Sequence, residues 1–384
     1  MTVDPLSPVR PAATNHLDRD DDMAPEPGTA LCLSGGGYRA MVFHIGALWR
    51  LYELGRLRPL KRISSVSGGS ITAAVLATRW NRLSFEPARL RQDFVTEVVA
   101  PLRALASRTI DAGSILGGIL LPGSIADMVA QAYRDHLFQN RTLQDLPDEP
   151  RFVINATNVQ SGALWRFSKP YMGDWRVGLV PTPKVSLATA VAASSAFPPV
   201  LSPLVLELDP KSFKAGSGAE LQRAPYTSRV VLSDGGVYDN LGLETIWKRY
   251  DTILVSDGGG QMAAEPEPKE DWARHAYRIL DVIDNQVRSL RKRQVVGSFQ
   301  DRTRKGTYWG VRTDIKSYGL ADALPCPLDR TMALAELPTR LKSMPDETQE
   351  RLINWGYAVT DAALRKHVDP ALPVPAGFPY ANGV

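Results

Sequence analysis

The sequence is poor in cysteine and histidine, with only two and five of them among 384 residues. Two thiols are too few for the disulfide framework of a small secreted domain or for a four-thiolate metal site. We therefore expect Cys32 and Cys326 to behave as small buried apolar side chains. The histidines show no HExxH or other paired spacing, which excludes the common zinc-hydrolase signature.

Long hydrophobic runs are also absent. The longest uncharged stretch of interest, residues 112–126, has only fifteen residues and is interrupted by Pro122 and several glycines. A membrane-spanning helix needs about twenty predominantly apolar residues, so this stretch is too short to cross a bilayer. The N-terminus has no basic start followed by an apolar run, which excludes a secretory signal peptide. We expect a cytoplasmic protein that is soluble or contacts membranes peripherally.

Both ends of the chain are rich in proline. Residues 1–27 contain six acidic residues against two basic ones and have little apolar content, so we expect a disordered leader. Residues 368–384 contain four prolines and are expected to form an irregular tail. The apolar content of the chain, 44%, supplies a sizeable core for the body, 28–367. We expect one domain there, with a C-terminal helical extension from about residue 265.

The body alternates short apolar runs with helical patterns. Strands are predicted over 29–34, 62–66, 152–156, 164–168, 229–232, 252–255 and 307–311, and helices over 38–54, 71–80, 185–193, 271–296 and 346–366. Strands interleaved with helices are typical of an α/β sheet covered by helices. The helix over 38–54 has apolar residues all around it, so we expect it to be largely buried.

A glycine turn, Gly35-Gly36-Gly37, joins the first strand to that helix, and its N–H groups favour an anion. The turn lacks the lysine and hydroxyl of a P-loop. Its spacing fits a dinucleotide-binding turn, but the next strand ends without a ribose-binding carboxylate. Consecutive glycine N–H groups also suit an oxyanion hole, which stabilises a developing alkoxide. A plain turn without a ligand is the third interpretation.

A serine turn follows the second strand. Ser65-Val66-Ser67-Gly68-Gly69 lies between this strand and an Ala-rich helix, which is the context of the G-x-S-x-G nucleophile elbow. Ser67 is the candidate nucleophile because Ser64, Ser65 and Ser70 lack a glycine two residues later. The alternative is that Ser67 only caps the following helix.

A serine nucleophile needs a base. The histidines are poorly placed for this role: His44 lies on the buried helix, and His275 and His367 lie on other helical segments. Asp234 is the better candidate, because it ends an apolar strand and precedes two glycines that permit a close approach to the serine. A plain Asp-Gly turn is the alternative. Asp257, in a second strand-end DGG sequence, and Asp239 are rival bases.

In this order, GGGxR at 35–39, the serine elbow at 65–69 and DGGxxxN at 234–240 resemble the patatin-like phospholipase family, which is related to the cytosolic phospholipases A. The resemblance extends over about residues 29–260 and includes the SSAFPP sequence at 194–199. It implies a three-layer α/β/α sheet with a Ser–Asp dyad at the carboxyl edge of the strands. Ser67 would be the nucleophile and Asp234 the base.

Other positions gain roles from the same resemblance. Asn240 stands where the family pattern requires it, whereas Asp257 lacks this asparagine, which favours Asp234 as the base; Ser65 stands where the family has glycine. Gly35, Gly36 and Gly37 would form the oxyanion hole, with Arg39, Gly69, Gly235, Gly236 and Asn240 as supporting residues. Arg39 would hold the loop or bind a substrate phosphate.

The resemblance implies a lipid acyl hydrolase of the phospholipase A or lysophospholipase type that needs no metal and no cofactor. Its partner would be a phospholipid or another acyl-ester lipid. The stretch 112–126 would contribute to the acyl-chain entrance, or form a buried turn. The alternative functions are a general carboxylesterase or acyltransferase, and a non-catalytic lipid-binding module.

Seven basic residues and one acidic residue lie within 288–305. Arg288, Arg291 and Lys292 are spaced to share one helical face. Such a face attracts anionic lipid, which predicts peripheral membrane contact. The alternative is a solvated face that pairs with Asp281 and Asp284. Aromatic residues are few in this run, so we expect no nucleic-acid partner.

Overall fold

The computed structural model describes residues 25–86, 89–110 and 125–384. The predicted leader and the stretch 112–126 therefore lie almost entirely outside the described residues. The first strand begins at Glu26, and residues 368–384 contain neither helix nor strand. None of the described helices combines the length and the apolar character that crossing a bilayer requires.

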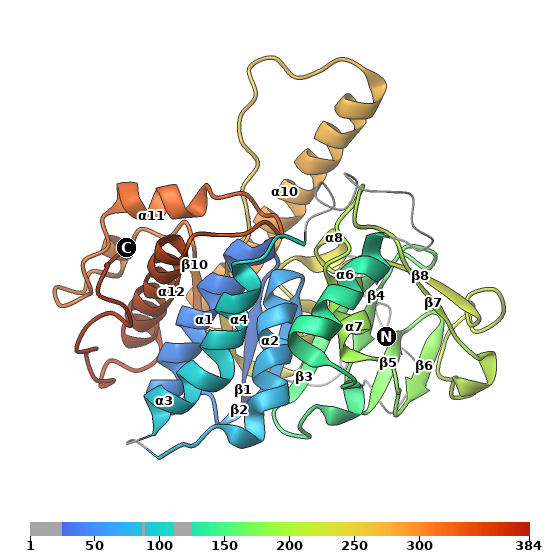
Figure 1. Ribbon diagram of the computed structural model, residues 1–384, viewed down its shortest axis with the longest axis horizontal. Coiled ribbons are helices and arrows are strands. Elements are labelled where there is room, and N and C mark those ends of the chain that lie inside the picture. The colour runs from blue at the N-terminus through green and yellow to red at the C-terminus, as the bar shows by residue number, and fades with distance from the viewer. Residues whose placement is uncertain (1–24, 87–88, 111–124) are drawn as a thin grey trace.

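In the described part of the chain, ten strands form one sheet (Figure 1). The strands are β1 (Glu26–Leu33), β2 (Leu60–Val66), β3 (Arg151–Asn158), β4 (Ala163–Phe167), β5 (Tyr171–Asp174), β6 (Gly178–Pro181), β7 (Leu204–Glu207), β8 (Arg229–Asp234), β9 (Tyr250–Asp257) and β10 (Lys305–Gly310). Their order is β10-β9-β1-β2-β3-β4-β5-β6, and β8 pairs with both β3 and β7. The predicted sheet is confirmed, whereas β5, β6 and β7 were missed because each has only four residues and gives too short a pattern.

The sheet is parallel from β10 to β3 and antiparallel beyond it. Two different strands share one edge of β3. The parallel strand β2 pairs as far as Val66 with Asn155, and the antiparallel strand β8 then pairs from Asp234 with Ala156. The carboxyl ends of β2 and β8 therefore meet head to head beside two consecutive residues of β3.

Helices cover both faces of the sheet, as the predicted three-layer architecture requires. They are α1 (Gly37–Glu53), α2 (Gly68–Arg79), α3 (Leu90–Phe94), α4 (Ala100–Ala106), α6 (Ile125–Tyr133), α7 (Leu187–Ser194), α8 (Gly236–Asp239), α9 (Glu244–Trp247), α10 (Trp272–Gln300), α11 (Leu328–Ala335) and α12 (Asp346–His367). In β1, Leu31 and Leu33 pack into the larger core with α1, α2 and α12, whereas Ala30 and Cys32 pack into a smaller core with α9 and α10. Cys32 and Cys326 are both buried free thiols, as predicted.

The C-terminal helix α12 is part of the same core as the N-terminal helix α1. A Cβ on Gly46 would lie 1.9 Å from the carbonyl oxygen of Ile353, and a Cβ on Gly356 would lie 2.0 Å from that of Phe43. Only glycine permits such close contact of two helix backbones. The helical extension predicted beyond residue 265 therefore packs directly on the first helix of the body.

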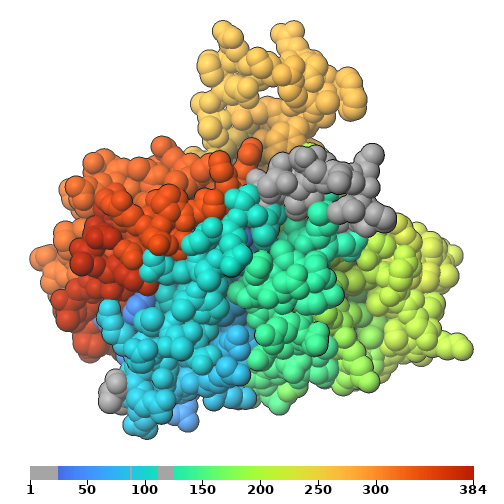
Figure 2. Space-filling model, viewed as in Figure 1, coloured from blue at the N-terminus to red at the C-terminus, as the bar shows by residue number. Residues whose placement is uncertain are grey.

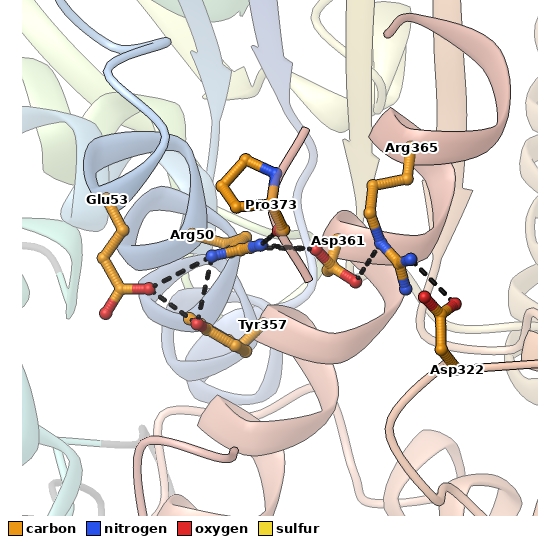
Figure 3. Close-up of polar contacts among 7 residues, drawn as sticks. All are labelled: Arg50, Glu53, Asp322, Tyr357, Asp361, Arg365 and Pro373. Atoms are coloured by element: carbon orange, nitrogen blue, oxygen red, sulfur yellow. Dashed lines mark hydrogen bonds and ion pairs between the residues drawn. The ribbon is translucent and has the colours of Figure 1, made fainter. Parts of the chain in front are cut away.

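Buried charges join the same two helices (Figure 3). The Asp361 carboxylate of α12 accepts hydrogen bonds from Arg50 of α1 at 2.8 Å and from Arg365 at 2.9 Å. Tyr357 lies beside Arg50 and donates a hydrogen bond to Glu53. Because Asp361 and Arg50 are almost fully buried, this network fixes the docking of α12.

Candidate active site

Ser67 occupies a strained turn between β2 and α2. Its backbone has φ 51° and ψ −121°, a left-handed conformation that non-glycine residues avoid. The two following glycines are needed for space: a Cβ on Gly68 would lie 2.1 Å from the Gly37 carbonyl oxygen, and one on Gly69 would lie 2.4 Å from that of Leu33. This geometry is that of a nucleophile elbow rather than of a helix cap, and Ser67 makes no capping hydrogen bond.

Asp234 meets Ser67 at the head-to-head junction of β8 and β2. The Ser67 hydroxyl lies close enough to the Asp234 carboxylate to influence its ionisation, and the Gly236 N–H donates a hydrogen bond to this carboxylate at 2.6 Å. Burial raises the pKa of Asp234 to about 7, although the Gly236 N–H and the nearby Ser67 hydroxyl lower it in part. Gly235 allows the turn, because a Cβ there would lie 2.3 Å from the Asn155 carbonyl oxygen.

The glycine turn lies beside the elbow, because β1 and β2 are paired parallel up to Leu33 and Ser65. The Gly35 N–H already donates to the Asn240 carbonyl at 3.0 Å, so this amide is not available to an oxyanion. Gly36 and Gly37 line the cavity at Ser67, and their N–H groups have no partner among the described residues. Of the three glycines predicted to be donors, the geometry supports two. A Cβ on Gly35 would lie 3.1 Å from the Cβ of Ser67, so this glycine provides space.

A cavity of about 610 Å³ includes Ser67, Asp234, Gly36 and Gly37 in its lining. One part of the lining is apolar and comprises Phe197, Pro198, Pro199, Val200, Leu201 and Leu341. Another part comes from α10 and comprises Tyr277, Arg278, Asp281, Asp284, Asn285 and Arg288. The cavity therefore offers both an apolar surface and a charged surface to a molecule that reaches Ser67.

The sequence model of the family described as patatin-like phospholipase matches residues 31–247, more than half of the chain. The chain belongs to this family. The resemblance inferred from the three motifs is confirmed. Comparison with curated protein sequences gave no match.

The solved structures to which this chain is similar include a human phospholipase, a Legionella pneumophila protein and a type III effector. Human GIVD cytosolic phospholipase A2 is 16% identical, with a TM-score of 0.49 over 88% of this chain and 57% of that one. VipD from Legionella pneumophila is 17% identical, with a TM-score of 0.38 over 89% of this chain and 67% of that one. The type III effector ExoU is 16% identical, with a TM-score of 0.33 over 90% and 54%. The chain thus spans between about half and two thirds of these proteins.

The rival bases in the patatin-like domain have structural partners. The Asp257 carboxylate pairs with Lys292 at 2.6 Å and accepts hydrogen bonds from Tyr308 and Gly259. The nearby cations of Lys292 and Arg288 hold the pKa of Asp257 far below its ordinary value despite its burial, so this carboxylate cannot accept a proton near neutral pH. Asp239 accepts hydrogen bonds from the backbone N–H groups of Leu241 and Glu244.

None of the four histidines that the structure describes lines the cavity. His44 is buried in α1, where Nε2 lies 3.0 Å from the Ser34 carbonyl and Nδ1 lies 2.9 Å from the Ser256 hydroxyl. Burial lowers the pKa of His44 to about 4, so it stays neutral and braces the strand before the glycine turn. His275 is exposed on α10.

Arg39, two residues after the glycine turn, anchors the start of α1 to neighbouring segments. Its guanidinium donates to the carbonyls of Gly258, Ala335 and Leu337 at 2.6–3.2 Å. These contacts join α1 to the DGG turn after β9 and to the segment after α11. The geometry therefore supports the first of the two roles predicted for Arg39, which is to hold the loop.

Two polar residues that position the elbow were missed. The Ser67 N–H donates to the Ser194 hydroxyl at 3.0 Å, and Ser194 donates to the Asn155 carbonyl at 2.6 Å. The Asn155 side chain also donates to the Ser65 carbonyl. Ser194 belongs to the SSAFPP sequence, but no pattern gave it a role. The only signal for Asn155 was a polar residue within an apolar strand.

Ser65, which replaces the family's elbow glycine, is accommodated by the same network. Its hydroxyl donates to the Val153 carbonyl at 3.3 Å and accepts from Ser70, whose oxygen lies 2.9 Å from that of Ser194. All three hydroxyls are buried and hydrogen-bonded, so the extra side chain is satisfied beneath the elbow.

The basic run 288–305 is directed partly inward. Arg291 pairs with Glu244 at 2.8 Å, and Arg288 lies 3.8 Å from Asp284. Lys292 pairs with Asp257, so all three residues of the predicted basic face have carboxylate partners within the protein. Arg293 and Arg302 are the exposed arginines of the run.

Proposed function

We propose that the protein hydrolyses fatty-acyl esters of phospholipids through an acyl-enzyme at Ser67, with Asp234 as the general base. The observation that carries the proposal is that the strained Ser67 and a buried carboxylate, Asp234, lie together in the lining of one cavity. A pKa of about 7 suits a base that works near neutral pH. A carboxylate with an ordinary pKa near 4 would be a much weaker base.

The reaction has two steps. As the Ser67 oxygen attacks the ester carbonyl carbon, its proton passes to Asp234, and the carbonyl oxygen becomes an oxyanion that the N–H groups of Gly36 and Gly37 stabilise. Collapse of this intermediate breaks the ester C–O bond, and Asp234 returns the proton to the leaving alcohol. A water molecule then transfers a proton to Asp234 as its oxygen attacks the acyl carbon. When the bond between this carbon and the Ser67 oxygen breaks, Asp234 returns the proton to Ser67, and the fatty acid is released.

The two-part lining of the cavity supports a phospholipid or lysophospholipid as the substrate. Phe197 to Leu201 offer an apolar surface for an acyl chain, and α10 offers charged side chains for a polar headgroup. A carboxylesterase or acyltransferase acting on soluble esters would use the same dyad. A non-catalytic lipid-binding module is disfavoured, because binding alone gives no reason to maintain backbone strain of about 1–3 kcal/mol at Ser67.

The proposal is tested with a chromogenic short-chain acyl ester and with phospholipid vesicles. We expect Ser67→Ala and Asp234→Asn to lose at least about a thousandfold in kcat on both substrates, while Asp301→Asn, on the exposed end of α10, retains wild-type activity. A fluorophosphonate should label Ser67. Labelling at Ser64 or Ser70, or full activity in a folded Ser67→Ala protein, would contradict the proposal.

A further inference from the structure

Exposed apolar side chains are concentrated on α10. Among the described residues, eight of the fourteen large apolar side chains that are exposed belong to this helix. They include Trp272, which is 85% exposed, Leu280 at 59% and Ile283 at 55%. Figures 1 and 2 show α10 and the segment before it projecting from the body. An exposed apolar surface of this kind marks an interaction site.

An ordinary surface helix buries its apolar face and exposes its charged face, whereas α10 has the reverse arrangement. The outer face is defined by Trp272, Ala276, Ile279, Leu280, Ile283, Val287 and Leu290, which recur at intervals of three and four residues and include no charge. The charged residues Arg278, Asp281, Asp284 and Arg288 lie about half a turn away and line the cavity. The polar side of α10 therefore faces the candidate active site, and its apolar side faces solvent.

We propose that the outer face of α10 inserts into a lipid surface and holds the cavity against it. The proposal rests on the proposed function, because it supplies the route by which a phospholipid reaches Ser67. The argument for lipid is continuity: Phe197 and Val200 are also exposed, and they line the same cavity that the inner side of α10 lines. The apolar surface thus continues from the outer face to the place where an acyl chain must enter.

The charges of this region indicate that docking is driven by apolar contact. Residues 262–290 contain six acidic residues and four basic ones, so the projecting part of the chain carries a net negative charge. Anionic headgroups would not attract it, whereas burial of the outer face in the interfacial region of a bilayer does not depend on headgroup charge. Binding should therefore occur on zwitterionic vesicles and persist at high salt.

The experiment uses the full chain with vesicles of phosphatidylcholine, with and without phosphatidylglycerol, at low and high salt. We expect Leu280→Glu combined with Ile283→Glu to weaken sedimentation with phosphatidylcholine vesicles at least about tenfold. The matched control is Leu328→Glu combined with Val374→Glu, which changes two exposed apolar residues elsewhere and should bind as the wild type does. The emission of Trp272, taken as the difference between wild type and Trp272→Phe, should shift to the blue on binding.

Soluble-ester hydrolysis separates this inference from the proposed function. The Leu280→Glu, Ile283→Glu protein should retain wild-type turnover of a soluble ester while losing vesicle hydrolysis. Equal binding by both double variants would overturn the inference, and so would binding that requires anionic lipid and disappears at high salt. A wild-type dimer in size-exclusion chromatography that becomes monomeric in the Leu280→Glu, Ile283→Glu protein would assign the face to a second copy instead. Loss of soluble-ester turnover in Ser67→Ala tests only the proposed function.

Discussion

The backbones of Gly37 and Gly68 lie in direct contact at the start of α1 and α2. A Cβ on Gly68 would lie 2.1 Å from the Gly37 carbonyl oxygen and 3.0 Å from its carbonyl carbon. Gly68 follows the candidate nucleophile, and Gly37 carries a candidate oxyanion donor. This contact therefore sets the distance between the candidate nucleophile and the candidate oxyanion donors.

Gly68→Ala is expected to lower kcat on a soluble ester by about a hundredfold or more, because the glycine turn must move away from the elbow. The control is Gly297→Ala on α10, where an added Cβ meets no atom within 4 Å. This control should keep kcat within about twofold, since alanine is also the better helix former. Wild-type kcat in a folded Gly68→Ala protein would show that the contact does not matter to the reaction.

Ser67→Gly is expected to raise the free energy of unfolding by about 1–2 kcal/mol, because glycine adopts the observed positive φ without strain. Ser67→Ala removes the same hydroxyl but keeps the Cβ, so it should not gain this stability. Both proteins should be inactive. Denaturant unfolding measures the difference between them, and equal midpoints would argue that the elbow is unstrained.

The pH dependence of kcat/KM should follow Asp234. Burial raises its pKa to about 7, and only the ionised form accepts the serine proton. Activity on an uncharged soluble ester should therefore be low at pH 5, rise through about pH 7 and level off above it. A rise in kcat/KM centred near pH 4, where an ordinary carboxyl group titrates, would contradict the assignment of Asp234 as the base.

The free energy of unfolding should also depend on the ionisation of Asp234, but it should fall with rising pH where the activity rises. Asp234 has a higher pKa in the folded chain than in the unfolded chain, so the folded state binds more protons between about pH 4 and pH 7 and loses stability as the pH rises through that range. Asp234→Asn removes this loss and should be more stable than wild type by on the order of 2–4 kcal/mol above pH 7. Below pH 4 the two proteins should unfold at the same denaturant concentration. A constant difference at all pH values would exclude a buried titrating carboxylate.

The buried charges between α1 and α12 should be essential to the fold. Asp361→Asn removes the buried carboxylate that Arg50 and Arg365 share, and we expect a loss of up to about 3–5 kcal/mol in unfolding free energy, because the two arginines then keep only the more exposed carboxylates of Glu53 and Asp322. Glu347→Gln, which breaks the exposed pair with Arg351, should cost less than about 0.5 kcal/mol. Similar losses in the two proteins would mean that Asp361 does not fix α12.

Much of the candidate site could be predicted from the sequence, because its parts are local. The elbow at Ser67, the glycine turn and the DGG turn are each a strand followed by small residues, and strand ends and glycines are visible in a sequence. The sequence also favoured Asp234 over Asp257 through the presence of Asn240. The structure supplies a different, physical reason: Lys292 and Tyr308 bind the Asp257 carboxylate and lower its pKa, which makes it a weak base.

Contacts between distant segments could not be read in this way. That β8 meets β2 head to head depends on which edge of β3 each strand joins, and the Gly35 amide is engaged by Asn240, more than two hundred residues away. Neither relationship leaves a periodic pattern.

The sequence by itself determined the longer strands and helices and the residue types at the site, because these depend on neighbours along the chain. It also determined that α10 is amphipathic. Which side of α10 faces the protein could not be read from the sequence, and an ordinary amphipathic helix would bury its apolar side. The tertiary structure decided the opposite, since Glu244 and Asp257 lie where Arg291 and Lys292 can pair with them. Pairing of these charges against the body leaves the outer face of α10 between Trp272 and Leu290 in solvent, whereas Val295, nearer the end of the helix, is buried in the smaller core.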